Sequence, residues 1–252
     1  MIRRLAVIAG LLAAWTSAAG AAEIKVLSAG AMKSLVTELG EAFKQETGHT
    51  LSMTFGPVGA QSKQLASGEA ADMVVLTDVA IDQLEGQGLV VAGSRVDIAR
   101  VGVGVAVREG GPRPDISTPE AFKQTLLAAR SLVYVDPARG ATSGIHFASV
   151  LQRLGIAEAV KSKTILIPTG FAAEVVARGE AEICVHQISE ILPVKGVTLV
   201  GPLPRELQKV TIYSGGLATK AAAPEAARAF LAFLTRPAFK PKLAAAGLDY
   251  RE

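Results

Sequence analysis

The sequence of 252 residues contains one cysteine, few aromatic residues (5%) and none of the common catalytic signatures. A single Cys184 excludes an internal disulfide, and its apolar neighbours Ile183 and Val185 favour a small buried side chain over a reactive thiol. The chain has no G-x-S-x-G motif, no Walker loop, no H-E-x-x-H motif and no paired cysteines. These absences argue against the enzyme classes that such motifs mark, and no metal or other cofactor is predicted.

An excess of one charge is also lacking. The chain has 26 basic and 23 acidic residues, and loss of Arg3 and Arg4 with a cleaved leader would leave 24 basic residues. A nearly neutral chain without a stripe of Lys or Arg does not indicate a nucleic-acid partner. We therefore expect any bound anion to be held by local geometry and not by the overall charge of the protein.

Long apolar runs are absent after residue 22, so stable membrane insertion is not expected. At the N-terminus, the basic pair Arg3 and Arg4 precedes a short apolar run, Leu5 to Ala14, and small residues continue to Ala22. This pattern predicts a signal peptide over residues 1–22, cleaved near residues 21–23, and a periplasmic mature protein. An uncleaved anchor is the alternative.

What the chain does contain is an alternation of apolar runs and amphipathic segments, which predicts an α/β fold with parallel strands and helices on both faces of each sheet. Four predicted strands are each followed by a turn of small residues and then by a helix. These turns are Ser28–Ala31, Gly56–Ala60, Asp136–Gly144 and Pro168–Gly170. The first turns of helices leave backbone N–H groups unpaired, and the helix dipole adds positive charge there. Such turns suit an anion, provided that they face one another.

Two β-rich runs predict crossings between two lobes. Val96 to Val107 is a long β-branched run interrupted by Gly102 and Gly104, and Val210 to Leu217 is a candidate return crossing. Glycines in a long strand can absorb a bend. The sequence thus predicts a first lobe of residues 23–102 plus 211–252 and a second lobe of residues 103–210.

Several stretches resemble the periplasmic molybdate-binding proteins of ABC importers, over nearly the whole mature chain. They are Val26-Leu27-Ser28-Ala29-Gly30-Ala31-Met32, Phe55 to Gly68 with Ala71-Asp72, Val135-Asp136-Pro137 with Gly144-Ile145, and Arg178-Gly179-Glu180-Ala181. The resemblance implies a type II periplasmic binding fold, with two α/β lobes, a two-strand hinge and an oxyanion held in the cleft by hydrogen bonds, without a metal.

The sequence differs from that family where hydroxyl donors are expected. Ala31 stands where the family usually has a serine, Pro57 to Ala60 replaces a serine-rich turn, and Gln187 aligns with a tyrosine of many members. A tetrahedral dianion needs several donors, because each unmet bond to a charged group costs roughly 1–3 kcal/mol. The small residues Ala31 and Gly59 are also expected to enlarge the cleft. These differences favour a larger anion, such as a di- or tricarboxylate.

The expected ligand-binding residues come from the four turns and their neighbours. They are Ala29, Gly30, Ala31, Lys33, Gly59, Ala60, Arg139, Thr142, Ser143, Gly170, Phe171 and Gln187. Lys33 lies in the first turn of a predicted helix, where a cation is disfavoured unless an anion is bound, although a solvated lysine is the simpler interpretation.

The first hypothesis is a monomeric periplasmic solute-binding protein that closes around a small anion and delivers it to an ABC permease. The second is an isomerase, because a branch with the same fold resembles aconitate isomerase, which moves a double bond in a tricarboxylate. That chemistry needs a base near an acidic C–H, and His146, His186 and Lys33 are the candidates. The third is an exported domain with an inactive cleft.

Overall fold

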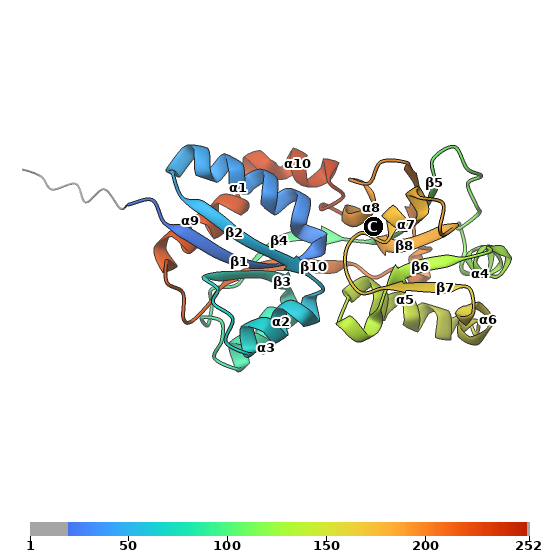
Figure 1. The fold of residues 1–252 in the computed structure, drawn as a ribbon, viewed down its shortest axis with the longest axis horizontal. Helices are drawn as coiled ribbons and strands as arrows, with labels where there is room; N and C mark the ends of the chain where they lie inside the picture. The colour runs from blue at the N-terminus through green and yellow to red at the C-terminus, as the bar shows by residue number, and fades with distance from the viewer. Residues whose placement is uncertain (1–19, 251–252) are drawn as a thin grey trace, which may run out of the picture.

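The computed structural model describes residues 20–250. Its strands form two five-stranded sheets, each carrying helices, and the two lie side by side along the longest axis of the molecule (Figure 1). This arrangement confirms the predicted α/β fold of two lobes. The strands are not all parallel as predicted, because β10 (Thr211–Leu217) in the first sheet and β5 (Val103–Arg108) in the second run antiparallel to their neighbours. We call the first sheet with its helices the first lobe and the second sheet with its helices the second lobe. Most of the predicted signal peptide, residues 1–19, lies outside the described residues.

The first lobe has the strand order β2-β1-β3-β10-β4. Its strands are β1 (Glu23–Ala29), β2 (Thr50–Gly56), β3 (Met73–Thr77), β4 (Val96–Val101) and β10 (Thr211–Leu217). Its helices are η1 (Gly30–Met32), α1 (Lys33–Thr47), α2 (Val58–Ala66), α3 (Asp78–Gly86), α9 (Pro224–Leu234), η4 (Pro237–Phe239) and α10 (Lys240–Ala245). β1 runs parallel to β2 and β3, whereas β10 runs antiparallel to β3 and β4.

Helices cover both faces of this sheet, which is why its central strands are almost entirely apolar. α1 and α9 lie over one face, and α2 and α3 lie over the other (Figure 1). Phe43 of α1 packs against Phe230 and Phe233 of α9, with ring centroids 5.0 and 5.3 Å apart. This aromatic contact attaches α9 to the first lobe, although α9 comes after the whole of the second lobe in the sequence.

The second lobe has the strand order β7-β6-β8-β5-β9. Its strands are β5 (Val103–Arg108), β6 (Leu132–Val135), β7 (Thr164–Ile167), β8 (Ile183–Gln187) and β9 (Val197–Pro202). Its helices are α4 (Pro119–Ala128), η2 (Pro137–Arg139), α5 (Thr142–Arg153), α6 (Ala157–Lys161), α7 (Ala173–Ala177), α8 (Ile188–Ile191) and η3 (Arg205–Leu207). Phe122, Tyr134 and Phe147 pack together in its core, with ring centroids 5.0 to 6.3 Å apart.

The chain crosses between the lobes twice. Gly102 separates β4 from β5, so the long predicted strand is two strands that belong to different sheets. Between η3 and β10 the chain returns, and there the Gln208 side chain accepts from the backbone N–H of Val103 (2.9 Å) and donates to its carbonyl (2.8 Å). One side chain therefore ties the two crossings together, which makes this region the natural hinge.

Local capping residues mark some helix boundaries, and two boundaries differ from the predicted turns in a way that matters for the site. α1 ends before Gly48, whose φ of 79° makes it a left-handed cap, and the Thr118 hydroxyl caps α4. α2 begins at Val58 and α5 at Thr142, each three residues earlier than predicted. The small turn residues continue directly into the helix, so the first helical turns reach the inter-lobe cleft.

The short helices α6 and α8 are not apparent from the sequence pattern, because a segment of five residues or fewer shows too little periodicity. Within residues 20–250, no helix combines the length and apolar character needed to cross a bilayer.

Candidate functional site

The four predicted turns meet at a cavity of about 290 Å³ between the lobes. The first lobe contributes Ala29, Gly30, Ala31, Lys33 and Phe55 to Val58. The second lobe contributes Val135, Ala141 to Ser143, Thr169 to Phe171, Glu174, His186, Gln187 and Glu190, and Tyr213 reaches the cavity from β10. The carboxyl ends of β1, β2 and β6 all open here, the usual position of ligands in open α/β sheets. The turns therefore line one shared crevice.

Nine of the expected ligand-binding residues line this cavity. They are Ala29, Gly30, Ala31, Lys33, Thr142, Ser143, Gly170, Phe171 and Gln187. Gly59, Ala60 and Arg139 are not among the lining residues, so their part in ligand binding stays a prediction. Because α2 starts at Val58, its second residue, Gly59, lies beside the cavity and faces the second lobe. Arg139 ends η2, one residue before the loop reaches Gly140.

Gly59 and Gly140 form a direct contact between the lobes. The Gly59 N–H donates to the carbonyl of Gly140 at 3.1 Å. A Cβ on Gly59 would lie 2.9 Å from the Cα of Gly140, and a Cβ on Gly140 would lie 2.6 Å from the Cα of Gly59. We call this pair the glycine clasp. The absence of a side chain at Gly59 thus permits backbone-to-backbone contact between the lobes, which differs from the expected enlargement of the cleft.

Lys33 lies at one end of the cavity, between aromatic rings from both lobes. Its Nζ is 6.0 Å from the centroid of the Phe55 ring and 5.6 Å from that of Phe171. Among the ion pairs of residues 20–250, none involves Lys33. Of the described lining residues, it is the sole lysine or arginine. An anion that entered this end would meet an ammonium group without a carboxylate partner.

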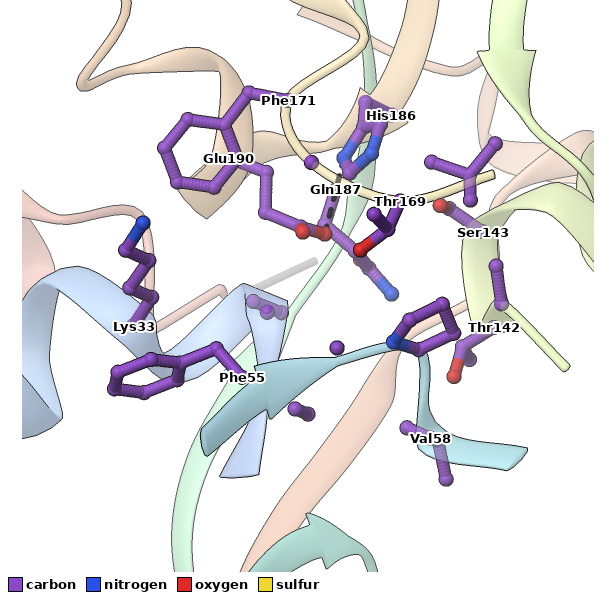
Figure 2. A pocket seen from close by; sticks show the side chains of 18 of the residues that line it. Lys33, Phe55, Val58, Thr142, Ser143, Thr169, Phe171, His186, Gln187 and Glu190 are labelled. Carbon is purple, nitrogen blue, oxygen red and sulfur yellow. Dashed lines mark ion pairs between the residues drawn. The ribbon is translucent and has the colours of Figure 1, made fainter. Parts of the chain in front are cut away.

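Thr142 and Ser143 lie at the other end of the cavity (Figure 2). They are the first two residues of α5, a helix of twelve residues, and its cap residue Ala141 makes no side-chain capping bond. The first backbone N–H groups of a helix have no partner within it, and the two hydroxyls stand beside them. This end offers polar donors and the positive end of a helix dipole.

A carboxylate and an imidazole, both buried, lie together in the middle of the cavity. His186, at 1% exposure on β8, places its Nδ1 3.0 Å from Oε2 of Glu190, which is 8% exposed on α8. Among the described residues, neither ring nitrogen of His186 has a hydrogen-bond partner besides this ion-pair contact. Figure 2 shows the Glu190 carboxylate lying between the Lys33 end and the Ser143 end of the cavity. We call His186 and Glu190 the buried pair.

Glu190 also reaches across to the first lobe. A methyl group placed on Gly30 would lie 2.7 Å from Oε1 of Glu190. The carboxylate therefore rests against the Gly30 turn, which the sequence predicted as a place for an anion. The buried pair thus connects β8, α8 and the first turn after β1.

A second set of buried polar groups surrounds Tyr213, which is 2% exposed. The Gln187 amide lies within 3.3 Å of the Tyr213 hydroxyl and 3.4 Å of the Thr211 hydroxyl, while its Oε1 has no partner. Burial, and then the neighbouring Glu190 charge, raise the pKa of Tyr213 far above its ordinary value, against the opposing effect of hydrogen bonds to Thr142 and Gln187. Tyr213 is therefore a neutral hydroxyl at any physiological pH.

Other singled-out residues lie elsewhere. His146 bonds through Nε2 to the Leu207 carbonyl at 2.8 Å and is not a lining residue. Burial lowers the pKa of His146, and its hydrogen bond to Leu207 partly opposes this shift. The thiol of Cys184 is fully buried, and burial raises its pKa, as expected for an inert side chain. Residues 20–250 contain no cluster of three or more potential metal ligands.

Glu190 and Tyr213 line the cavity but are not among the residues predicted from the sequence. Glu190 lies in Ile188-Ser189-Glu190-Ile191, and a charge inside an apolar segment after a buried strand is a usable signal, because charges are rarely buried without function or a partner. Its spacing of four residues from His186 strengthens that signal. Tyr213 follows from no local pattern, since only the return crossing brings β10 to the cavity.

Comparisons with known proteins agree with this architecture. The model of the bacterial extracellular solute-binding protein family matches residues 24–249. Aconitate isomerase from a Pseudomonas species is 38% identical over 217 residues, which span 84% of this chain and 81% of the relative. The molybdate-binding protein ModA of Azotobacter vinelandii is 29% identical over 235 residues, covering 91% and 89% of the two chains.

A solved structure of the periplasmic molybdate-binding protein of Azotobacter vinelandii superposes with a TM-score of 0.76 at 19% identity, covering 91% of this chain and all of that one. At this identity the likeness shows the fold, and it matches the two lobes described above. The resemblance to periplasmic molybdate-binding proteins is thereby confirmed. By its matching model and its relatives, the chain belongs to the bacterial extracellular solute-binding protein family.

Proposed function

We propose that this protein isomerises a small tricarboxylate of the aconitate type in the cleft between its lobes. The observation that carries the proposal is the buried pair, an acid–base group in the middle of a cavity with donors at both ends. The similarity to an aconitate isomerase supports the same activity. The proposal makes the second hypothesis from the sequence the preferred one.

The charge of Glu190 disfavours a molybdate-like dianion in this cavity. Two unit charges about 4 Å apart repel by about 4 kcal/mol at an effective dielectric constant of about 20. A tetrahedral oxyanion presents negative oxygens in every direction, so one of them would face Glu190. A tricarboxylate can instead direct its carboxylates to the two ends of the cavity and a C–H group toward Glu190.

The two ends provide different kinds of donor. At one end, Lys33 supplies a positive charge; at the other, Thr142 and Ser143 supply hydroxyls beside the first turn of α5. The Gln187 amide adds a polar group between them. We assign these four residues to ligand binding, together with the backbone of Ala29, Gly30 and Ala31 and of Gly170 next to Phe171.

Turnover tests the proposal directly. Purified protein is mixed with cis- or trans-aconitate, and the change in ultraviolet absorbance is followed at high protein concentration. We expect conversion toward the same mixture of isomers from either side. Parallel melting curves with citrate, sulfate and molybdate should show stabilisation by tricarboxylates alone, because ligands that bind the native state raise the melting temperature. No absorbance change with either aconitate would refute the isomerase function.

A solute-binding protein for an ABC importer is the second candidate. The family and the two hinged lobes favour it. In that case the mature protein is a periplasmic monomer, released by cleavage of residues 1–22, that captures a di- or tricarboxylate and docks on a permease. Tight binding of a carboxylate without any turnover would support this candidate over the first.

A further inference from the structure

The geometry points to Glu190 as the residue that carries the proton in this reaction, with His186 as its positioning residue. This inference rests on the proposed isomerase function and names the base that the sequence left open. It differs from each candidate considered there, because Lys33, His146 and His186 were the three groups expected to act as a base.

The position of Glu190 supports this assignment. Its carboxylate lies between the two ends of the cavity (Figure 2), so the middle of a tricarboxylate held at both ends would pass beside it. Its side chain is 11% exposed, so little water competes for the carboxylate. One oxygen rests against the Gly30 turn and the other faces His186, which leaves little freedom for rotation.

The earlier candidates are less well placed. His146 is bonded to the Leu207 carbonyl and does not line the cavity. Lys33 lies at one end between two aromatic rings, where it suits a substrate carboxylate. The imidazole of His186 is 1% exposed and lies against Glu190, so it contacts the carboxylate more readily than a substrate. Glu174 also lines the cavity, but it is exposed to solvent, so water competes with a substrate for its carboxylate.

The proposed step is a proton transfer between the two ends of an allylic unit. The Glu190 carboxylate takes a proton from the substrate methylene, and the electrons of that C–H bond form a new C=C bond with the adjacent carbon. The electrons of the original double bond shift outward and take up a proton at the far carbon from the protonated Glu190. Atoms and charge balance over the cycle, and Glu190 is returned as the carboxylate. No oxidant, reductant or co-reactant is needed.

Replacement of the carboxylate tests the role of Glu190. We expect Glu190→Gln to lower kcat by about 1,000-fold, in the middle of the usual range of about 100- to 10,000-fold for loss of an acid–base group. KM should change less than about threefold, because the amide occupies the same volume and the donors at the two ends remain. Glu190→Asp should recover part of kcat. The matched control is Glu158→Gln, the same chemical change on exposed α6, with kinetics equal to wild type.

The possible outcomes separate this inference from the proposed function. If the wild-type protein converts no aconitate, the function itself is refuted. If the wild-type protein is active and Glu190→Gln keeps kcat within about tenfold, Glu190 is not the base. A large rise in KM with unchanged kcat would likewise overturn the inference, because it would make Glu190 a binding residue.

The positioning role of His186 has its own readout. His186→Gln retains a donor that can reach Glu190, whereas His186→Met of similar length does not. We expect His186→Met to have a lower kcat than the wild type and His186→Gln to retain much of the wild-type kcat. The two variants should have melting temperatures within a few degrees of each other. Equal kcat values for the two variants would refute the positioning role. If His186 were purely structural, kcat would depend on the stability of each variant and not on whether residue 186 carries a hydrogen-bond donor.

Discussion

The two walls of the cavity differ in the kind of chemistry they present. The wall from the first lobe consists mainly of small and apolar residues, with Lys33 as its one charged side chain and Tyr213 as its one hydroxyl. The wall from the second lobe carries Ser143, His186 and Glu190, among other polar side chains. Under the isomerase function that we propose, the first lobe would hold and shape the ligand and the second lobe would supply the reacting groups. The following variants test that division.

The largest effect is expected where the two walls touch. Gly30→Ala adds a methyl group at 2.7 Å from Oε1 of Glu190, so the carboxylate must move. A shift of about 1 Å in a reacting group costs roughly 100-fold in rate, and we expect kcat to fall by about that factor. Steady-state kinetics with aconitate measure it. The control Gly86→Ala adds its methyl group where no atom lies within 4 Å, and it should leave kcat unchanged.

Full activity of Gly30→Ala would show that Glu190 does not depend on the first-lobe wall. That result would contradict the proposed division between the two walls, because the shape of the first-lobe wall would have no influence on Glu190.

The glycine clasp provides the next test. Gly59→Ala brings a methyl group to 2.9 Å from the Cα of Gly140, and backbone atoms on both sides leave little room to adjust. Overpacking costs about 1–3 kcal/mol. A cost of about 1.4 kcal/mol, in the lower part of that range, raises Kd about tenfold for a ligand that requires closed lobes. Calorimetric titration with citrate measures the affinity. An unchanged Kd would mean that the lobes need not close on the ligand.

A smaller effect is expected at Lys33. Lys33→Met removes the charge but keeps a side chain of similar length between the Phe55 and Phe171 rings. Because Lys33 is exposed, water screens its charge, and such pairs contribute up to about 1 kcal/mol, or roughly a fivefold rise in KM. kcat should stay near wild type. Lys44→Met, at the far end of the same helix, is the control. An equal rise in KM for that variant would show that the net charge of the protein, and not the position of Lys33, determines KM.

Much of this architecture is predictable from the sequence. The apolar runs around Ile24, Met73 and Leu132 indicate strands, and the turns of small residues after several strands indicate where a ligand binds. Glycines and capping residues such as Gly48 and Thr118 mark helix ends because their conformational preferences are local.

The buried pair and the glycine clasp are not predictable in the same way. Glu190 meets Gly30, and Gly59 meets Gly140, only after both lobes have folded and approached each other. Such contacts depend on the relative placement of two sheets, which no local pattern encodes. Tyr213 enters the cavity for the same reason, because β10 crosses back into the first sheet next to β3.

The smallest effect concerns stability and not activity. Burial lowers the pKa of His146, so below its ordinary pKa near 6.5 the unfolded chain binds a proton that the folded chain resists. The free energy of unfolding should therefore fall as the pH decreases through and below that value. His146→Gln should show a weaker decrease in urea titrations at pH 7 and pH 5, while kcat at pH 7 stays unchanged. If the free energy of unfolding of the wild type and of His146→Gln fell equally between pH 7 and pH 5, a group other than His146 would be responsible.

The central claim, that the second-lobe wall performs proton transfer on a ligand held by both walls, is tested most directly by proton NMR. Wild-type protein is incubated with trans-aconitate at equal concentration, and the vinyl and methylene signals are followed over time. The account predicts that the signals of cis-aconitate appear with wild type and with Glu158→Gln but not with Glu190→Gln. A spectrum of trans-aconitate that stays unchanged with the wild-type protein would contradict it.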